Sequence, residues 1–275
     1  MRIHRAIAEL RVARQSAGRV ALVPTMGNLH EGHIALVREA VQRADQVFVS
    51  IFVNRLQFGE HEDFDHYPRT IERDLQMLEE AGAAHVFAPA ETEMYSSPQR
   101  YYVVPPPEQA SILEGAFRAG HFRGVTTVVL KLFNIVLPDV ALFGKKDYQQ
   151  LIILDDMVRE LSLPISIVAV ETVRAVDGLA LSSRNHYLSL AERSEAPRLY
   201  RVLDHCRQCV RSGTRNFSEL ESDAVRELAR HGWKPDYVAI RRRKDLLPPV
   251  DERESLVVLA AATLGKARLI DNVEI

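Results

Sequence analysis

Residues 24–33 read PTMGNLHEGH and lie where a short apolar run gives way to a segment of helical spacing. The run 19–23 predicts a β-strand, and the apolar residues of 34–41 recur at the spacing of one helix face. Gly27 and Gly32 allow the backbone to approach a ligand closely. A strand, a glycine-containing turn and a helix predict the first unit of an α/β fold, with a turn that can bind phosphate.

The same alternation of patterns continues along the chain. Apolar runs predict further strands at 47–53, 86–88, 140–143 and 165–170. Helical spacing separates these runs at 70–81, 125–137 and 151–161. This alternation predicts a parallel sheet with right-handed crossovers, in which ligands bind outside the carboxyl ends of the strands.

The pattern changes beyond Thr172, where we place a boundary between an α/β domain (1–172) and a smaller α+β domain (173–275). The second domain is predicted to have helices at 196–210 and 217–231 and strands at 237–240 and 256–261. In the first domain, the loop 95–107 contains prolines that cannot extend a central strand or a helix. We expect this loop to form a flap or an edge.

Composition limits the partners. The 275 residues are 47% hydrophobic and 26% charged, with a formal net charge of -2. This balance gives no electrostatic footprint for nucleic acid or an anionic membrane, so we expect small-molecule partners. No apolar run approaches the roughly 20 residues needed to cross a bilayer, and residues 1–10 lack the apolar region of a signal peptide. These features predict a cytoplasmic protein.

Cys206 and Cys209 form a C-x-x-C pair inside a segment of helical spacing. Redox pairs of this kind lie at a strand-to-helix turn, and neither another cysteine nor a local histidine pair would complete a metal site. We interpret the pair as one residue packed in a helix interface and one exposed thiol.

His30 and His33 are three residues apart and project onto one face of the first helix start. The N–H groups and positive dipole end there favour phosphate, and two imidazoles can donate to polyphosphate oxygens as charge moves to leaving pyrophosphate. The alternative is that one histidine caps the helix and the other fills an interface. A metal site is disfavoured, because the His-Glu-x-x-His spacing and an obvious third ligand are absent.

Two further turns carry phosphate-binding chemistry. Residues 143–150, FGKKDYQQ, form a strand-to-helix turn in which a lysine can meet phosphate and Asp147 can accept ribose hydroxyl hydrogen bonds. An ordinary charged helix start is the alternative. Ser182, Ser183 and Arg184 follow an Asp-Gly turn and offer two hydroxyls and a cation, although serine-rich turns are common.

Neutral polar side chains indicate a small polar acid as a ligand. Asn54 and Gln57 follow the second strand, and Gln150 lies in the turn just described. Amides bind hydroxyl and carboxylate oxygens without adding charge. His121 opens the long apolar helix with the sequence HFRG. Each of these residues could instead tie a loop to its scaffold.

Together these motifs resemble the pantothenate synthetase family. The resemblance spans nearly the whole chain in order, through PTMG (24–27), HFRG (121–124), G-x-KD (144–147), SSRN (182–185) and RLIDN (268–272). The His-x-Gly-His element is shared with other nucleotidyltransferases, so the ordered set carries the assignment.

The resemblance implies a Rossmann-like nucleotidyltransferase domain, a smaller C-terminal lid domain, a homodimer, and dependence on ATP and Mg²⁺ for joining pantoate to β-alanine. It implies that the ATP phosphates are held by His30, His33, Lys146, Ser182, Ser183 and Arg184, that Gly144 and Asp147 lie near the nucleoside, and that Met26 and Gly27 also contact ATP. It implies that Met26, Gln57 and Gln150 line the pantoate site, and that Asn54 and His121 support this pocket. The implied catalytic residues are His30, His33, Lys146 and Arg184, and the magnesium ligands are not identified.

The implied reaction has two steps. Pantoate carboxylate attacks the α-phosphorus of ATP to give a pantoyl-adenylate, while nearby cations offset the charge growing on pyrophosphate. The amine of β-alanine then attacks the acyl carbon and AMP leaves. No residue stands out as the base for that amine, and closure of the lid domain would keep water from the anhydride.

Three places depart from the family pattern. Arg55 stands where the family usually has proline, and Lys145 where it usually has glutamate. Their charge could tighten binding of ATP or pyrophosphate, but we expect both to face solvent. The run 241–244, RRRK, replaces a stretch that is usually more acidic and is expected to be a solvated edge rather than a nucleic-acid site.

Other interpretations stay open. Another nucleotidyltransferase of this superfamily could pass AMP to a phosphorylated acceptor, and a noncatalytic ATP-binding regulator could share the fold. The neutral amides favour a hydroxy acid over a phosphate ester, and the presence of every expected phosphate-contacting residue favours an active enzyme. An aminoacyl-tRNA synthetase is disfavoured, because neither an anticodon-binding extension nor a large basic surface is evident.

Overall fold

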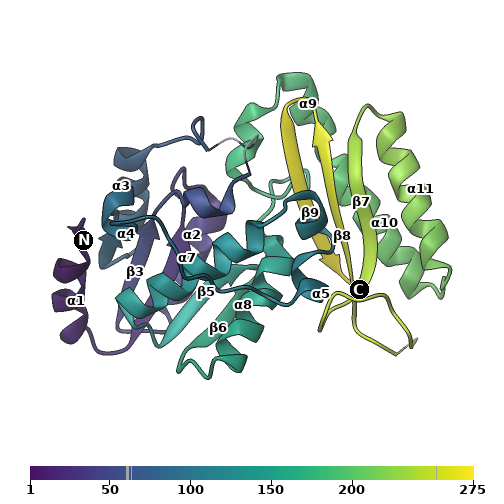
Figure 1. The fold of residues 1–275 in the computed structure, drawn as a ribbon. Coiled ribbons are helices and arrows are strands. Elements are labelled where there is room, and N and C mark those ends of the chain that lie inside the picture. The colour runs from purple at the N-terminus through teal and green to yellow at the C-terminus, as the bar shows by residue number, and fades with distance from the viewer. Residues whose placement is uncertain (60–61, 63, 252) are drawn as a thin grey trace. The chain divides into compact units, whose positions relative to one another are not determined.

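The computed structural model describes residues 1–59, 62, 64–251 and 253–275 (Figure 1). The chain divides into two compact units. The first comprises Met1–Gly144 and Ile153–Glu171, and the second comprises Lys145–Ile152 and Thr172–Ile275. A domain boundary at Thr172 stays our proposal, and the contacts additionally assign the short segment 145–152 to the second unit.

A six-stranded parallel sheet forms the first unit, in the order β1-β4-β3-β2-β5-β6. Its strands are β1 (Arg2–His4), β2 (Val20–Thr25), β3 (Gln46–Ile51), β4 (His85–Phe87), β5 (Val140–Gly144) and β6 (Ser166–Val170). The predicted α/β fold with a parallel sheet is confirmed. β1 is absent from the sequence-based prediction, because its single apolar residue lies between an arginine and a histidine and forms no apolar run.

The strand order reverses between β2 and β5. Strands β2, β3 and β4 follow one another in one direction from this point, and β5 and β6 in the other. Open α/β sheets bind their ligands outside the carboxyl ends of the strands at such a reversal. Met26 comes directly after β2 and Gly144 ends β5, so both lie at this edge of the sheet.

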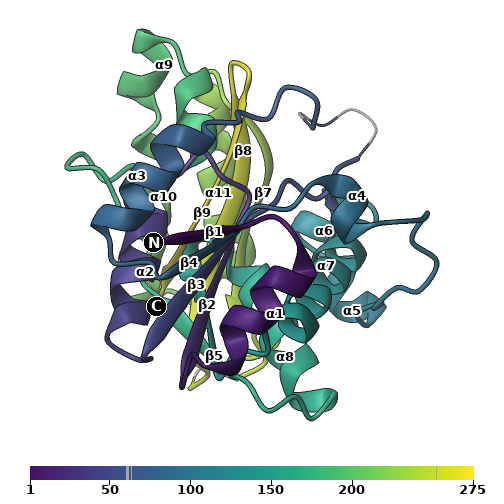
Figure 2. The ribbon, with the colours of Figure 1, turned by 90° about the vertical axis from the view of Figure 1, so that its left-hand side faces the viewer.

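Helices cover both faces of this sheet. α2 (Glu31–Val41) and α3 (Ile71–Glu80) lie on one face, and α1 (Ile7–Gln15) and α7 (His121–Val136) lie on the other (Figure 2). A central strand covered on both sides is apolar along nearly its whole length, which is the pattern of β2 and β3. The core beneath α2 and α3 includes Ala21, Val23, Val37, Ala40, Val49, Leu78, Val86 and Leu142.

Short helical segments lie in the connections of the first unit. They are η1 (Arg55–Gln57), α4 (Glu91–Met94), α5 (Pro107–Ala110) and α6 (Glu114–Phe117). The loop 95–107 is tied to α7: the Val103 N–H donates to Thr127 Oγ1 at 3.1 Å, and the Thr126 hydroxyl donates to the Val103 carbonyl at 2.8 Å. This loop therefore packs as a cover on α7, and no strand forms in it.

The second unit has a three-stranded antiparallel sheet in the order β7-β8-β9. Its strands are β7 (Lys234–Arg242), β8 (Leu256–Leu264) and β9 (Ala267–Glu274). The prediction of a smaller α+β region is confirmed. β9 is missing from that prediction, because charged and apolar residues are mixed along it and it reads as a motif rather than as a strand.

Helices α10 (Arg198–Arg211) and α11 (Phe217–Arg230) pack on this antiparallel sheet around the buried indole of Trp233. The predicted stripe is buried throughout, in Ala196, which directly follows α9 (Leu190–Glu195), and in Leu199, Leu203, Cys206 and Val210 of α10. Cys206 and Cys209 are both free thiols, the first buried and the second partly exposed, which confirms the interpretation of this pair. Burial raises the pKa of the Cys206 thiol to about 11.

Four other helical segments complete the description: η2 (Lys145–Asp147), α8 (Tyr148–Glu160), η3 (Ser183–Tyr187) and α9 (Leu190–Glu195). α8 begins in the second unit and continues into the first. Of the helices formed by described residues, none is both long and apolar enough to cross a membrane.

Candidate active site

The loop after β2 has a backbone conformation that few residue types adopt. Gly27 and Asn28 have successive positive φ angles of 83° and 49°. The buried carboxylate of Asp74 in α3 holds this turn, accepting the N–H of Asn28 at 2.8 Å and that of Leu29 at 2.8 Å. The Thr70 hydroxyl also donates to Asp74, at 3.0 Å. Asp74 therefore shapes the loop that leads to the two histidines.

The sequence-based prediction missed Asp74, although a signal was present. Ile71, Leu75 and Leu78 define the apolar stripe of α3, and Asp74 lies on that same face and is buried. A charged residue on an apolar helix face needs partners that satisfy it.

His30 and His33 form a reciprocal cap at the start of α2. The Gly32 N–H donates to His30 Nδ1 at 3.1 Å, and the His30 N–H donates to His33 Nδ1 at 3.3 Å. The ring centroids are 4.1 Å apart. Because each Nδ1 accepts a hydrogen bond, a neutral ring carries its proton on Nε2. Both histidines thus take part in the cap through Nδ1, where the alternative assigned only one of them to it, and this arrangement leaves Nε2–H as the donor of each neutral ring.

Met26, Asn54 and Gln57 lie together at the carboxyl ends of β2 and β3. The Asn54 amide donates to Gln57 Oε1 at 3.1 Å and to the Gly124 carbonyl at 3.2 Å, and the Gln57 amide lies 3.2 Å from Met26 Sδ. The Tyr95 hydroxyl donates to Asn54 Oδ1 at 2.7 Å. Asn54 is only 1% exposed, so its hydrogen bond holds the Gln57 side chain from the protein interior.

Gly124 lets α7 approach η1 closely. A Cβ at this position would lie 2.1 Å from the carbonyl oxygen of Leu56 and 2.6 Å from the backbone nitrogen of Gln57. Only glycine therefore fits between the helix and the turn. The turn that carries Gln57 is set by backbone contact with α7.

His121 fastens the same turn from the start of α7. Its Nδ1 is 2.8 Å from the Gln57 carbonyl, and its Nε2 is 3.0 Å from Arg118 Nη1. Arg118 can only donate, so the Nδ1 of His121 carries the proton and donates to Gln57. Burial, followed by the charge of Arg118, lowers the pKa of His121 to about 4, which keeps the ring neutral. Arg118 is itself paired with Glu62 at 2.6 Å.

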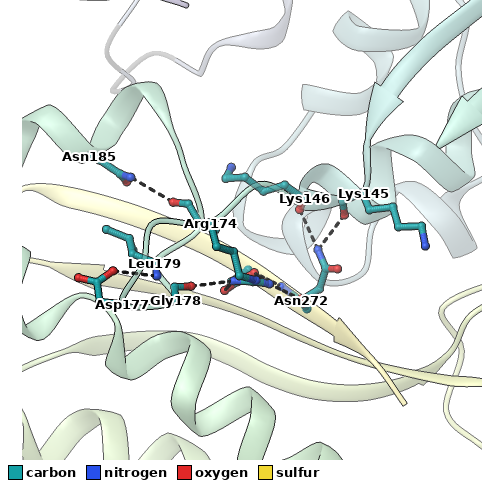
Figure 3. A network of polar contacts seen from close by, with 10 residues as sticks. Lys145, Lys146, Arg174, Asp177, Gly178, Leu179, Asn185 and Asn272 are labelled. Carbon is teal, nitrogen blue, oxygen red and sulfur yellow. Dashed lines mark hydrogen bonds and ion pairs between the residues drawn. The ribbon is translucent and has the colours of Figure 1, made fainter. Parts of the chain in front are cut away.

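The second unit carries the remaining predicted residues. Lys146 and Asp147 lie in η2, and Gln150 lies in the first turn of α8. Lys146 and Gln150 are partly buried, and Asp147 is exposed. Figure 3 shows the side chains of Lys145 and Lys146 extending in opposite directions from this turn.

Ser182 directly precedes η3 (Ser183–Tyr187), which begins with Ser183 and Arg184, and all three residues are partly buried. Ser182 caps this helical turn, because its hydroxyl accepts the N–H of Arg184 at 3.3 Å. The predicted Asp-Gly turn precedes them, with Gly178 at a φ of 97°. The predicted residues therefore fall into two groups, one on each unit.

The expectation that Lys145 faces solvent is wrong. Its side chain is 17% exposed, and its Nζ pairs with Glu274 Oε2 at 3.1 Å. Glu274 Oε1 accepts the Tyr148 hydroxyl at 3.0 Å and an Arg243 nitrogen at 2.8 Å. Lys145 therefore belongs to a network of ion pairs and hydrogen bonds around Glu274, the last residue of β9. Its glutamate partner lies 129 residues away and gives no local signal.

The other two departures from the family pattern, Arg55 and the run 241–244, also form ion pairs. Arg55 is more than half exposed, as expected, and its guanidinium contacts Glu91 at 3.2 Å and lies 3.9 Å above the Phe64 ring. The solvated edge expected at 241–244 is correct for Lys244 only. The three arginines are more buried and pair with acidic residues: Arg241 with Glu221, Arg242 with Asp245 and Glu254, and Arg243 with Glu274. Each of these arginines is therefore paired with a carboxylate of the second unit.

Among the described residues, no three histidine, cysteine, aspartate or glutamate side chains come together as a metal site. Magnesium in ATP-using enzymes is commonly held by the phosphates and water with only one or two carboxylates. The dependence on Mg²⁺ stays a prediction.

A six-stranded parallel sheet of reversing order, with a small antiparallel sheet after it, defines a Rossmann-like α/β protein. Residues 2–274 match the model of the pantoate-beta-alanine ligase family, and the chain belongs to this family. It is therefore an enzyme of the ligase class.

Relatives and solved structures agree with this assignment. The pantothenate synthetases of Neisseria meningitidis serogroup C and Laribacter hongkongensis are each 58% identical over 275 residues, covering 100% of this chain and 99% of theirs. The crystal structure of pantothenate synthetase from Thermus thermophilus has a TM-score of 0.94 at 45% identity, covering 100% of this chain and 99% of that one. A Francisella tularensis pantoate-beta-alanine ligase, in complex with beta-gamma ATP and β-alanine, has a TM-score of 0.84 at 33% identity and covers 100% and 97%.

Proposed function

We propose that this chain condenses pantoate with β-alanine in two ATP-dependent steps through a pantoyl-adenylate. Membership of the ligase family supports the overall reaction. The Francisella relative, in complex with beta-gamma ATP and β-alanine, supports ATP and β-alanine as substrates. ATP enters as its magnesium complex, with the metal held mainly by phosphate oxygens and water.

The contact between Met26 and Gln57 is the observation that carries the proposal. It joins the loop after β2 to the turn after β3, at the edge where the strand order reverses. The histidine pair begins the helix four residues after Met26. A carboxylate bound by neutral amides beside a phosphate-binding helix start is the arrangement that adenylation requires.

In the first step, a pantoate carboxylate oxygen forms a bond to the α-phosphorus and the bond to pyrophosphate breaks. Gln57 and Gln150 bind oxygens of pantoate without a charge that would weaken the nucleophile. His30 and His33 donate Nε2–H bonds to phosphate oxygens as neutral rings, because protonating Nδ1 would break their caps. Lys146 and Arg184 supply the positive charge, with Ser182 and Ser183 as further donors.

In the second step, the neutral amine of β-alanine attacks the acyl carbon. A C–N bond forms, the C–O bond to AMP breaks, and the nitrogen loses a proton. Positioning two bound reactants can supply effective molarities of about 10⁵ M or more. We propose that the second unit serves as a lid that keeps water from the adenylate. Release of AMP without β-alanine should then be much slower than pyrophosphate exchange.

The test is release of pyrophosphate and AMP from ATP by the purified protein, with pantoate and β-alanine supplied together, singly or not at all. We expect pyrophosphate to depend on pantoate, and AMP and pantothenate to appear only when β-alanine is added. Transfer of AMP to a phosphorylated acceptor, or ATP binding without turnover, would instead support the nucleotidyltransferase or the regulator. Sedimentation would check the homodimer, which stays a prediction.

A further inference from the structure

The side-chain amide of Asn272 holds the turn that carries Lys146. Its Nδ2 donates to the carbonyl of Lys145 at 2.8 Å and to that of Lys146 at 2.9 Å (Figure 3). The turn, η2, is only three residues long, and such short 3₁₀ segments have poor hydrogen-bond geometry of their own. Asn272, on β9, therefore sets the backbone from which the Lys146 side chain extends.

Asn272 is fixed in turn by an ion pair. Asp271 is 3% exposed and accepts two hydrogen bonds from the Arg174 guanidinium, at 2.6 and 2.8 Å. Its carboxylate also accepts the N–H of Asn272 at 2.7 Å, and Arg174 donates to the Asn272 carbonyl at 3.1 Å. A bidentate pair of this kind is geometrically specific, so it restricts the position of Asn272.

The same arginine reaches the turn that leads to the serines. Arg174 donates to the Gly178 carbonyl at 3.1 Å, and its guanidinium lies 4.0 Å from the Tyr200 ring centroid. Asn185, which follows the serines, donates to the Ala180 carbonyl at 3.0 Å. Together with the chain between Gly178 and Ala180, these bonds link two segments of the second unit, 145–147 and 182–184, that both carry residues proposed for phosphate binding.

We propose that Asn272 is a positioning residue for Lys146, and that the Arg174–Asp271 pair holds it in register with the segment 182–184. The inference rests on the proposed function, because it assumes that Lys146 meets the phosphates of ATP. Asn272 touches no reacting atom in this scheme. It acts through the backbone of η2, so its loss should displace the ammonium rather than remove a contact to substrate.

The first test uses Asn272→Ala, which removes both hydrogen bonds, and Asn272→Asp, which keeps the shape but sets carboxylate oxygens against two carbonyls. Displacing a catalytic group by about 1 Å can cost roughly 100-fold, so we expect pantoate-dependent exchange of pyrophosphate into ATP to fall by about 10- to 100-fold. The KM for β-alanine should change less than about twofold, since the second step does not use this turn. Arg268→Ala is the matched control: it lies on the same strand, pairs with Asp236 at 2.7 Å, and should leave exchange unchanged.

The second test is a double-mutant cycle with Lys146→Ala, followed by calorimetric ATP binding as well as exchange. If Asn272 acts through Lys146, adding Asn272→Ala to Lys146→Ala should cause almost no further loss of ATP affinity or exchange rate. Losses that multiply would overturn the proposal and indicate a general structural role. Hydrogen exchange should show faster amide exchange in 145–150 for both variants, and the buried carboxylate of Asn272→Asp should also lower the unfolding midpoint.

The two proposals fail in different ways. Wild-type protein that binds ATP but shows no pantoate-dependent exchange would reject the proposed function, while the binding cycle would still report on positioning. ATP affinity that is insensitive to Asn272→Ala and to Asn272→Asp, in a chain with normal exchange activity, would reject the positioning role alone.

Discussion

The Tyr95 hydroxyl donates a 2.7 Å hydrogen bond to Oδ1 of Asn54, a residue 41 positions earlier in the chain. This bond fixes the orientation of the Asn54 amide, whose nitrogen then faces Gln57 and the Gly124 carbonyl. Burial raises the pKa of Tyr95, so the phenol stays protonated and remains a donor across the usual assay range. The proposed pantoate pocket is thus held by a residue that would not touch pantoate.

Tyr95→Phe should weaken pantoate binding. It removes the donor that orients Asn54, and one such bond contributes about 1 kcal/mol, or roughly fivefold in binding. We expect the KM for pantoate to rise by about that factor, with the KM for ATP nearly unchanged. Steady-state kinetics with each substrate varied would check this. Tyr101→Phe is the control, because Tyr101 is 90% exposed, and an equal effect of the two changes would contradict the role of Tyr95.

Gly124→Ala should displace the turn that carries Gln57. The new methyl group would lie 2.1 Å from the Leu56 carbonyl oxygen, so α7 and η1 must separate. Overpacking of this kind costs about 1–3 kcal/mol of stability. We expect a lower unfolding midpoint and a larger KM for pantoate. Arg123→Ala, an exposed change in the same helical turn, should alter neither, and wild-type kinetics in Gly124→Ala would show that the close approach is unimportant.

Asp74→Asn should loosen the loop before the histidine pair. The amide keeps one acceptor oxygen, but its NH₂ group would face a backbone N–H, and a buried donor left unsatisfied costs about 1–3 kcal/mol. We expect slower pyrophosphate exchange and faster amide exchange at residues 27–30. Glu72→Gln, an exposed change in the first turn of α3, serves as the control. Unaltered amide exchange in Asp74→Asn would reject the role given to this carboxylate.

Acid should destabilise the first unit through His85. Its Nδ1 is 2.9 Å from His4 Nε2 and its Nε2 is 2.8 Å from Gln46 Oε1. Burial, then the His4 charge, lowers the pKa of His85 from 6.5 to about 4. Between pH 6.5 and about 4, His85 is protonated in the unfolded chain but neutral in the folded one. The free energy of unfolding should therefore fall as the pH drops through this range.

Thermal unfolding of wild type and His85→Asn at pH 7, 6 and 5 would measure this contribution. The variant should lose less of its unfolding midpoint on acidification than the wild type does, because it no longer carries the group that protonates on unfolding. Parallel curves for the two proteins would assign the acid sensitivity to other groups. His231→Asn is a suitable control, since that histidine is an exposed residue of the second unit.

The sequence alone determined the alternation of strands and helices, the change from an α/β pattern to a smaller α+β pattern, and the ordered motifs. These features are encoded by local periodicity and by short stretches of chain, which can be recognised without a fold. The sequence also placed Met26, Asn54 and Gln57 at one edge of the sheet. Once the strands are known to be parallel, their carboxyl ends must lie together.

Only the tertiary structure decided what holds those residues in place. Asp74 and Asn28 are 46 positions apart, and Asn272 and Lys145 are 127 apart. The glutamate that pairs with Lys145 is equally remote, which is why its expected exposure is wrong. Hydrogen bonds between distant side chain and backbone atoms leave no period in the sequence, since one residue suffices at each end. They exist only once the packed sheet and helices have brought the two ends together.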